Sequence, residues 1–84
     1  MKNKTLFCVR LPATDKSFDL WVPHDLSVAK VTKLALDLLQ EQEKRNFKAD
    51  DNVSCYLKED GEELDPNKLI GEYGFANGTT LVLI

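Results

Sequence analysis

One helical stripe constrains the fold of this chain more than any other feature. Between residues 28 and 44, apolar residues recur at the 3.6-residue spacing of a helix face. They are Val28, Val31, Ala35, Leu38 and Leu39. Ser27 comes directly before them, where its hydroxyl can cap the first turn. A single helix must bury its apolar stripe, and the surrounding alternating segments offer one face of a sheet. The sequence therefore predicts a two-layer α+β fold.

Strands are predicted where apolar and polar residues alternate, which is the pattern of a strand with one buried face. These segments are residues 5–11, 17–22, 53–57 and 79–84. A polar turn after Pro12 joins the first two into a hairpin. The last segment is apolar on both sides, so we expect it near the middle of the sheet, beside the first. A short strand at 62–64, a helical turn starting at Asp65 and a turn at Asn77-Gly78 are predicted before it.

Two further leucines make the helical stripe wider than one sheet face needs. Leu34 and Leu36 flank it on either side. A loop through Phe47 could cover the excess, or a partner could receive it. We expect the loop.

Composition and charge exclude several classes of protein. The 84 residues are enough for one domain, which we expect to span 1–84. Eleven Lys and Arg against 14 Asp and Glu give a net charge of −3, whereas nucleic-acid binding needs a basic face. No apolar run approaches the roughly 20 residues of a membrane span. Arg10 and Pro12 interrupt the only region where a signal peptide could lie. We therefore expect a cytoplasmic protein without direct membrane insertion.

No catalytic, metal or cofactor site is visible in the sequence. Cys8 and Cys55 both lie in alternating segments and are expected as free thiols. His24 is the only histidine, so neither a four-ligand zinc site nor a Cys-His pair is expected. The acidic run 59–65 lacks the spacing of a calcium loop and is expected to be a solvated turn. The sequence predicts no enzyme activity and no cofactor.

The order and spacing of these segments resemble ubiquitin and the β-grasp fold over essentially the whole chain. The most specific match is Leu64, Ile70, the run 72–75 (Glu-Tyr-Gly-Phe) and the run 79–83 (Thr-Thr-Leu-Val-Leu). The resemblance implies a mixed sheet of four to five strands packed on one helix. The implied core consists of Phe7, Val9, Phe18, Leu20, Val22, Val28, Val31, Ala35, Leu57, Leu64, Ile70, Phe75, Leu81 and Leu83.

The end of the chain departs from ubiquitin and the sulfur-carrier β-grasp proteins. Those proteins act through a flexible tail ending in Gly-Gly, whereas this chain ends in Leu-Val-Leu-Ile. If the chain is complete, conjugation and sulfur transfer are not expected. Among β-grasp proteins without a tail, the chain is most similar to the YukD-like (EsaB-like) family of Gram-positive bacteria. The similarity lies in the length, the closing segment 74–81 and the long loop after the helix. It implies a cytoplasmic accessory or regulatory component of a type VII (Ess/Yuk) secretion system.

The sheet face opposite the helix, here called the open face, carries the candidate binding residues. Alternation places on it Leu6, Cys8, Arg10, Asp19, Trp21, Tyr56, Lys58, Val82 and Ile84. Val82 and Ile84 match positions in the apolar recognition patch of ubiquitin, whereas Lys58 replaces its central apolar residue. Trp and Tyr are typical anchors of protein interfaces. Trp21 could instead merely shield the sheet edge. The predicted protein-binding residues are Trp21, Tyr56, Lys58, Val82, Ile84, Leu6 and Cys8.

Several functions are consistent with the residues on the open face. The first is docking to a secretion-system membrane component or ATPase, with recruitment to the membrane by that partner. The alternatives are a general adaptor unrelated to secretion, a homodimer formed through the open face or the edge of the second strand, and a carrier protein whose Gly-Gly tail lies outside this chain.

Overall fold

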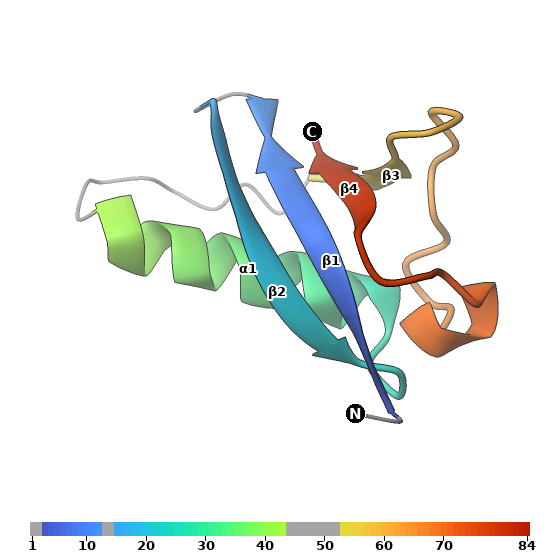
Figure 1. Ribbon diagram of the computed structural model, residues 1–84. Helices are drawn as coiled ribbons and strands as arrows, with labels where there is room; N and C mark the ends of the chain where they lie inside the picture. The colour runs from blue at the N-terminus through green and yellow to red at the C-terminus, as the bar shows by residue number, and fades with distance from the viewer. Residues whose placement is uncertain (1–2, 13–14, 44–52) are drawn as a thin grey trace.

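The computed structural model describes residues 3–12, 15–43 and 53–84, which form a sheet with a helix across one face (Figure 1). The elements in chain order are β1 (Lys4–Leu11), β2 (Lys16–Pro23), α1 (Val28–Glu43), β3 (Cys55–Leu57), the 3-10 helix η2 (Ile70–Tyr73) and β4 (Thr79–Leu83). The Ser27 hydroxyl accepts a hydrogen bond from the Lys30 backbone N–H at 3.2 Å and caps α1. The predicted helix, its cap and the hairpin are confirmed.

The strands form one mixed sheet in the order β2-β1-β4-β3. β1 pairs antiparallel with β2 and parallel with β4, and β4 pairs antiparallel with β3. The last strand therefore lies in the interior of the sheet beside the first, as its two-sided apolar sequence predicts. The short strand expected at 62–64 is reduced to an isolated bridge between Tyr56 and Glu63. The β-grasp architecture inferred from the sequence is confirmed.

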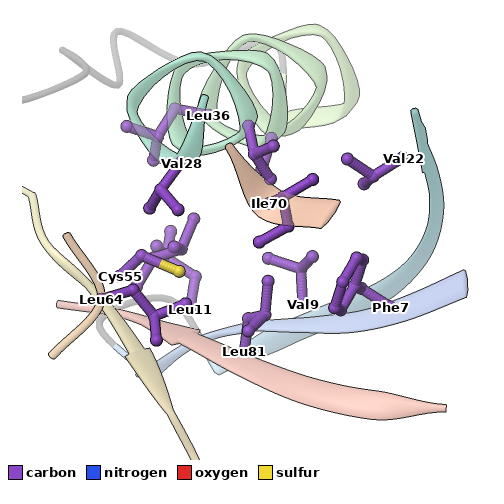
Figure 2. Close-up of a cluster of buried hydrophobic side chains, with 13 residues drawn as sticks. Phe7, Val9, Leu11, Val22, Val28, Leu36, Cys55, Leu64, Ile70 and Leu81 are labelled. Atoms are coloured by element: carbon purple, nitrogen blue, oxygen red, sulfur yellow. The ribbon is translucent and has the colours of Figure 1, made fainter. Parts of the chain in front are cut away.

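The core lies between α1 and the sheet and draws on every element (Figure 2). Its buried residues are Phe7, Val9, Leu11, Val22, Val28, Val31, Ala35, Leu36, Cys55, Leu64, Ile70, Leu81 and Leu83. Four residues of the implied core, Phe18, Leu20, Leu57 and Phe75, are only half-buried and pack against its margin. Phe18 and Leu20 belong to β2 and Leu57 to β3, the two edge strands, where fewer neighbours cover a side chain.

The two leucines that flank the helical stripe have different surroundings. Leu36 is buried on the side of Val28, Cys55 and Leu64 (Figure 2), whereas Leu34 is 38% exposed. The loop through Phe47, expected to cover the excess, lies outside the described residues.

The helical turn predicted from Asp65 is limited to one hydrogen-bonded turn, in which the Lys68 backbone N–H donates to the Asp65 carbonyl at 3.1 Å, and the 3-10 helix begins only at Ile70. The Asp65 carboxylate also accepts the Asn67 backbone N–H at 2.9 Å, which closes a side-chain turn over the same residues. The carbonyls of Pro66 and Lys68 accept the first backbone N–H groups of α1, those of Ala29 and Val28, at 3.0 and 2.9 Å. This segment therefore caps the large helix rather than forming one of its own.

A close approach between Gly71 and His24 ties η2 to the end of β2. The Gly71 backbone N–H donates to the His24 carbonyl at 3.0 Å. A Cβ at Gly71 would lie 2.5 Å from the Cβ of His24 and 2.9 Å from its carbonyl oxygen. The site accepts no side chain without a shift of backbone.

We expect Gly71→Ala to lower the free energy of unfolding by about 1–3 kcal/mol, because overpacking displaces η2 from the hairpin. Urea denaturation of the variant measures this change. Gly61→Ala is the control, since a Cβ there meets nothing within 4 Å and only the backbone φ of 72° opposes it. Its cost is expected at about 1 kcal/mol. A Gly71→Ala protein as stable as the wild type would contradict the close approach.

Candidate protein-binding surface

Strand register places all the predicted binding residues on the open face. In β1 the buried side chains Thr5, Phe7, Val9 and Leu11 alternate with Lys4, Leu6, Cys8 and Arg10. Leu6 lies opposite Trp21 of β2, and Cys8 lies opposite Asp19. On the other side of β1, Arg10 is level with Val82 of β4, and Val82 is opposite Tyr56 of β3. α1 covers the opposite face (Figure 1), so these side chains are not covered by the helix.

Exposure differs strongly among these side chains. Trp21 is 44% exposed and Ile84 is 69% exposed, high values for large apolar residues. Leu6, Cys8, Tyr56 and Val82 are half-buried, and Lys58 is exposed. Ile84 continues the line of β4, because it exchanges two backbone hydrogen bonds with Ser54 at 2.9 and 3.0 Å. The open face is therefore a sheet surface with exposed apolar groups at its two ends.

The register divides the expected apolar patch into two parts. Tyr56, Val82 and Ile84 form one group, here called the β3–β4 cluster. Leu6 and Trp21 form the other, the Trp21–Leu6 pair. Between them runs a more polar row: Asp19, Cys8, Thr80 and Lys58. Leu6 and Arg10 are four residues apart in β1, so the two parts are separated by about 13 Å along the strand. The separation between the two apolar groups follows from the register in which the strands pair.

A shallow hollow of about 390 Å³ adjoins the polar row. It lies where β3 ends beside the start of β4 and is lined by Leu57, Lys58, Glu59, Gly78, Thr79 and Thr80. Lys58 and Glu59 place opposite charges at its rim. The sequence identified Lys58 but not the others as surface candidates, because the hollow depends on how the end of β3 and the start of β4 come together. The hollow widens the surface that a partner could contact beside the β3–β4 cluster.

The two cysteines lie on opposite faces of the sheet and are free thiols, as expected. Cys8 is half-buried on the open face. Cys55 is 3% exposed, and burial raises the pKa of its thiol to about 11, an effect that the hydrogen bond to Thr32 partly opposes. The neutral thiol is the form that fits the core.

A thiol reagent is therefore expected to modify Cys8 rapidly and Cys55 only when the protein unfolds, because the thiolate is the reactive species. Mass spectrometry of tryptic peptides after labelling at pH 8 measures both sites, and Cys8→Ser is the control. Since the folded pKa of Cys55 lies above the ordinary 9.0, its contribution to stability is complete below pH 9. It should decline by about 1.4 kcal/mol per pH unit between 9 and 11. Equal labelling of both thiols in the folded protein would contradict the burial of Cys55.

His24 has a structural partner rather than a catalytic one. Its Nε2 lies 2.7 Å from the hydroxyl of Thr5, a buried residue on the face that carries the core. The ring therefore links the start of β1 to the turn after β2 and does not face Cys8. Within residues 3–12, 15–43 and 53–84, no group of three His, Cys, Asp or Glu side chains could hold a metal ion. No helix in the described part of the chain is long and apolar enough to cross a membrane.

Known structures share this architecture at low sequence identity. The ubiquitin-like domain of Plasmodium falciparum Dsk2 is 17% identical, with a TM-score of 0.71 and 95% of each chain covered. A ubiquitin-like domain from Arabidopsis thaliana is 23% identical, with a TM-score of 0.63, 98% of this chain covered and 77% of that one. A structure described as molecular mimicry of SUMO that promotes DNA repair is 17% identical, with a TM-score of 0.70 and coverage of 98% and 91%. These similarities show that the fold is ubiquitin-like.

Sequence comparison gives a family but no function. No curated protein matches the sequence. A family model described as "Protein of Unknown function (DUF2604)" matches residues 24–84, which include α1, β3, η2 and β4. This chain with a ubiquitin-like fold therefore belongs to the DUF2604 family.

Proposed function

We propose that this protein is a non-enzymatic binding module that docks to another protein through the open face of its sheet. The observation that carries the proposal is the β3–β4 cluster, an aromatic and two aliphatic side chains beside one another on the face that α1 leaves uncovered. Interfaces are enriched in aromatic anchors of this kind.

The cluster has the composition of an interface centre with a charged rim. Tyr56 offers a ring and a hydroxyl, and Val82 and Ile84 surround it with aliphatic surface. Arg10 lies level with Val82 in the neighbouring strand, and Lys58 follows in the polar row. Both rim residues are exposed and cationic. A partner with an apolar centre and carboxylates around it fits this face, because rim charges favour encounter with the opposite sign.

One partner of ordinary size can contact both parts of the open face. A standard interface buries about 800 Å² on each partner, a patch roughly 28 Å across, which exceeds the separation of about 13 Å between the β3–β4 cluster and the Trp21–Leu6 pair. Trp21, Leu6 and Cys8 are accordingly included in the proposed docking surface, with its centre at Tyr56 and Val82.

For the cellular setting, we propose an accessory or regulatory role in a type VII secretion system. The support is the similarity of the closing segment 74–81 to the YukD-like proteins. The expected partner is a membrane component or the ATPase of that system, which would recruit the module from the cytoplasm to the membrane.

Affinity capture with mild crosslinking from the native cells tests both parts of this proposal. The test variant is Val82→Asp with Ile84→Asp, which puts carboxylates into the β3–β4 cluster. The matched control is Leu69→Asp, an equally aliphatic position that is 41% exposed but lies by η2, bridged to Ser27 on the helix side. We expect secretion-system proteins to be recovered with wild type and Leu69→Asp, and lost with the double variant.

Two other outcomes would revise the proposal separately. Unchanged capture by a folded double variant would refute the docking surface. Recovery of unrelated proteins that the double variant no longer captures would keep the surface but remove the secretion role. The protein would then be a general adaptor.

A further inference from the structure

Within the described part of the chain, β2 is an edge strand with one hydrogen-bonding side unused. The sheet order leaves it paired only with β1 among the described residues. The His24 backbone N–H donates to the Asn3 carbonyl at 2.9 Å, and this bond fixes which residues of β2 face β1. In an antiparallel ladder the hydrogen-bonded positions alternate, so Phe18, Leu20 and Val22 point their backbone groups inward. The backbone N–H and C=O groups of Ser17, Asp19 and Trp21 therefore point away from the sheet.

The unused edge is long and only weakly protected. β2 has eight residues, from Lys16 to Pro23, whereas the opposite edge strand β3 has three. Natural edge strands are usually shielded by prolines, by inward-pointing charges or by short length. Here Lys16 and Pro23 stand only at the two ends of the strand, and the single acidic residue, Asp19, points to the open face. The middle of β2 is thus competent to accept another strand.

Apolar side chains are present on both sides of this edge. On the open face, Trp21 is 44% exposed at the sheet margin. On the helix face, Phe18 and Leu20 are half-buried. Leu34 lies about 200° around α1 from Leu36, which faces the β3 side (Figure 2), so Leu34 lies toward β2.

We propose that β2 pairs antiparallel with β2 of a second copy of this chain, joining two sheets into one. The two-fold axis passes through Leu20, which lies opposite Leu20 of the second copy. In this register Asp19 lies opposite Trp21 of the second copy, and Ser17 lies opposite Pro23 of the second copy. The outward donors of Asp19 and Trp21 then meet each other's carbonyls across the axis, and the Ser17 N–H meets the Pro23 carbonyl, which also accepts the Leu26 N–H of its own chain at 3.3 Å.

Charge, backbone geometry and strand length select this register, since centring the pair on Trp21 would place Ser17 opposite Asp25, beyond the end of β2 at Pro23. Centring the pair on Asp19 would place two carboxylates directly opposite, which destabilises a strand pair. Centring it on Phe18 would bring Trp21 opposite Asp15, whose φ of 53° ends the extended conformation. The Leu20 register avoids these faults. It also brings the Trp21 rings of the two copies into diagonal positions, within reach of each other on the open face.

A second copy accounts for the exposed tryptophan better than an unrelated strand does. In the two-fold pair, Trp21 is covered by Trp21 of the second copy, and Leu20 lies opposite Leu20 of the second copy. The β3–β4 cluster lies across the sheet from the two-fold axis, so both copies keep it free for a partner. The pairing covers Trp21 at the margin of the proposed docking surface but leaves its centre at Tyr56 and Val82 open, so dimer formation and partner binding are tested separately.

Sedimentation velocity of the full chain across a wide concentration range tests the pairing. We expect the mass to rise from 9.5 kDa to twice that value, with a blue shift of Trp21 emission as the exposed ring is covered. Trp21 is the only tryptophan, so the emission reports on this edge. Asp19→Pro removes one outward N–H while leaving the β1 ladder intact, and we expect it to stay monomeric. Asp19→Ala removes the same carboxylate but keeps the N–H, and it should dimerise.

Two substitutions that first introduce a charge repulsion and then relieve it test the register without a proline. Trp21→Asp would face Asp19 of the second copy and should abolish the dimer. Adding Asp19→Lys to the same chain should restore it, because each new aspartate then faces a lysine. A wild type that is monomeric throughout would overturn the proposal. So would a dimer unaffected by Asp19→Pro, or a double variant that fails to recover, since these would leave β2 out of the contact or the register wrong.

Discussion

Phe7→Ala is expected to be severely destabilising, because it empties a fully buried position in an interior strand. Phe7 is 1% exposed in β1, an interior strand, and its ring meets Phe75 edge-on at a centroid distance of 6.1 Å. Removing a buried phenylalanine side chain costs about 3–5 kcal/mol. A chain of 84 residues has a total stability of about 4–13 kcal/mol, because domains gain about 0.05–0.15 kcal/mol per residue. The loss is therefore comparable to the total free energy of unfolding at the lower end of this range.

Circular dichroism during urea denaturation measures this effect, and Phe18→Ala is the matched control. Phe18 is half-buried on the edge strand, so its removal leaves less of a cavity and should cost less. Equal losses for the two variants would show that the core is not centred where β1 and β4 meet α1.

Tyr56→Ala is expected to weaken binding to the partner by about 30-fold or more while the protein stays folded. Central aromatic residues of an interface cost about 2 kcal/mol or more when truncated. Every 1.4 kcal/mol is about tenfold in affinity. Tyr56 holds this position because β3 places it opposite Val82, with Arg10 in the next strand. Titration of the identified partner against wild type and variant gives the ratio.

Two further variants locate the binding energy on the open face. Tyr56→Phe keeps the ring and should retain most of the affinity. Trp21→Ala should weaken partner binding less than Tyr56→Ala does, because the polar row separates Trp21 from the β3–β4 cluster. A larger loss from Trp21→Ala would move the centre of the docking surface to the Trp21–Leu6 pair.

Local patterns in the sequence are sufficient to predict most of this fold. The helix, its Ser27 cap and the hairpin each follow from periodicity and from residues with defined turn or cap preferences. The interior position of β4 follows from its apolar character on both sides. The turn at Asp65 does not continue into a helix for a tertiary reason, since the carbonyls of Pro66 and Lys68 accept the first N–H groups of α1. Local sequence contains no sign of that contact.

The residues of the candidate surface could be predicted from the sequence, but their positions relative to one another could not. Alternation identifies which side chains share the open face, because successive residues of a strand point to opposite faces. Their neighbours depend on the register between strands that are distant in sequence. The same register separates Trp21 from Val82 and joins Val82 to Tyr56. Burial of Leu36 and exposure of Leu34 likewise depend on which flank of α1 faces β3.

Site-specific photocrosslinking in the native cells tests most directly whether the open face is the docking surface. A photoreactive residue would replace Lys58 on the open face and, in a separate protein, Lys33 on the exposed side of α1. Both positions exchange an exposed lysine, so the two proteins differ only in the face that carries the probe. We predict a crosslink from position 58 to one partner, identified by mass spectrometry, and none to that partner from position 33. A crosslink to the partner from position 33 alone would contradict the account and assign binding to the helix side.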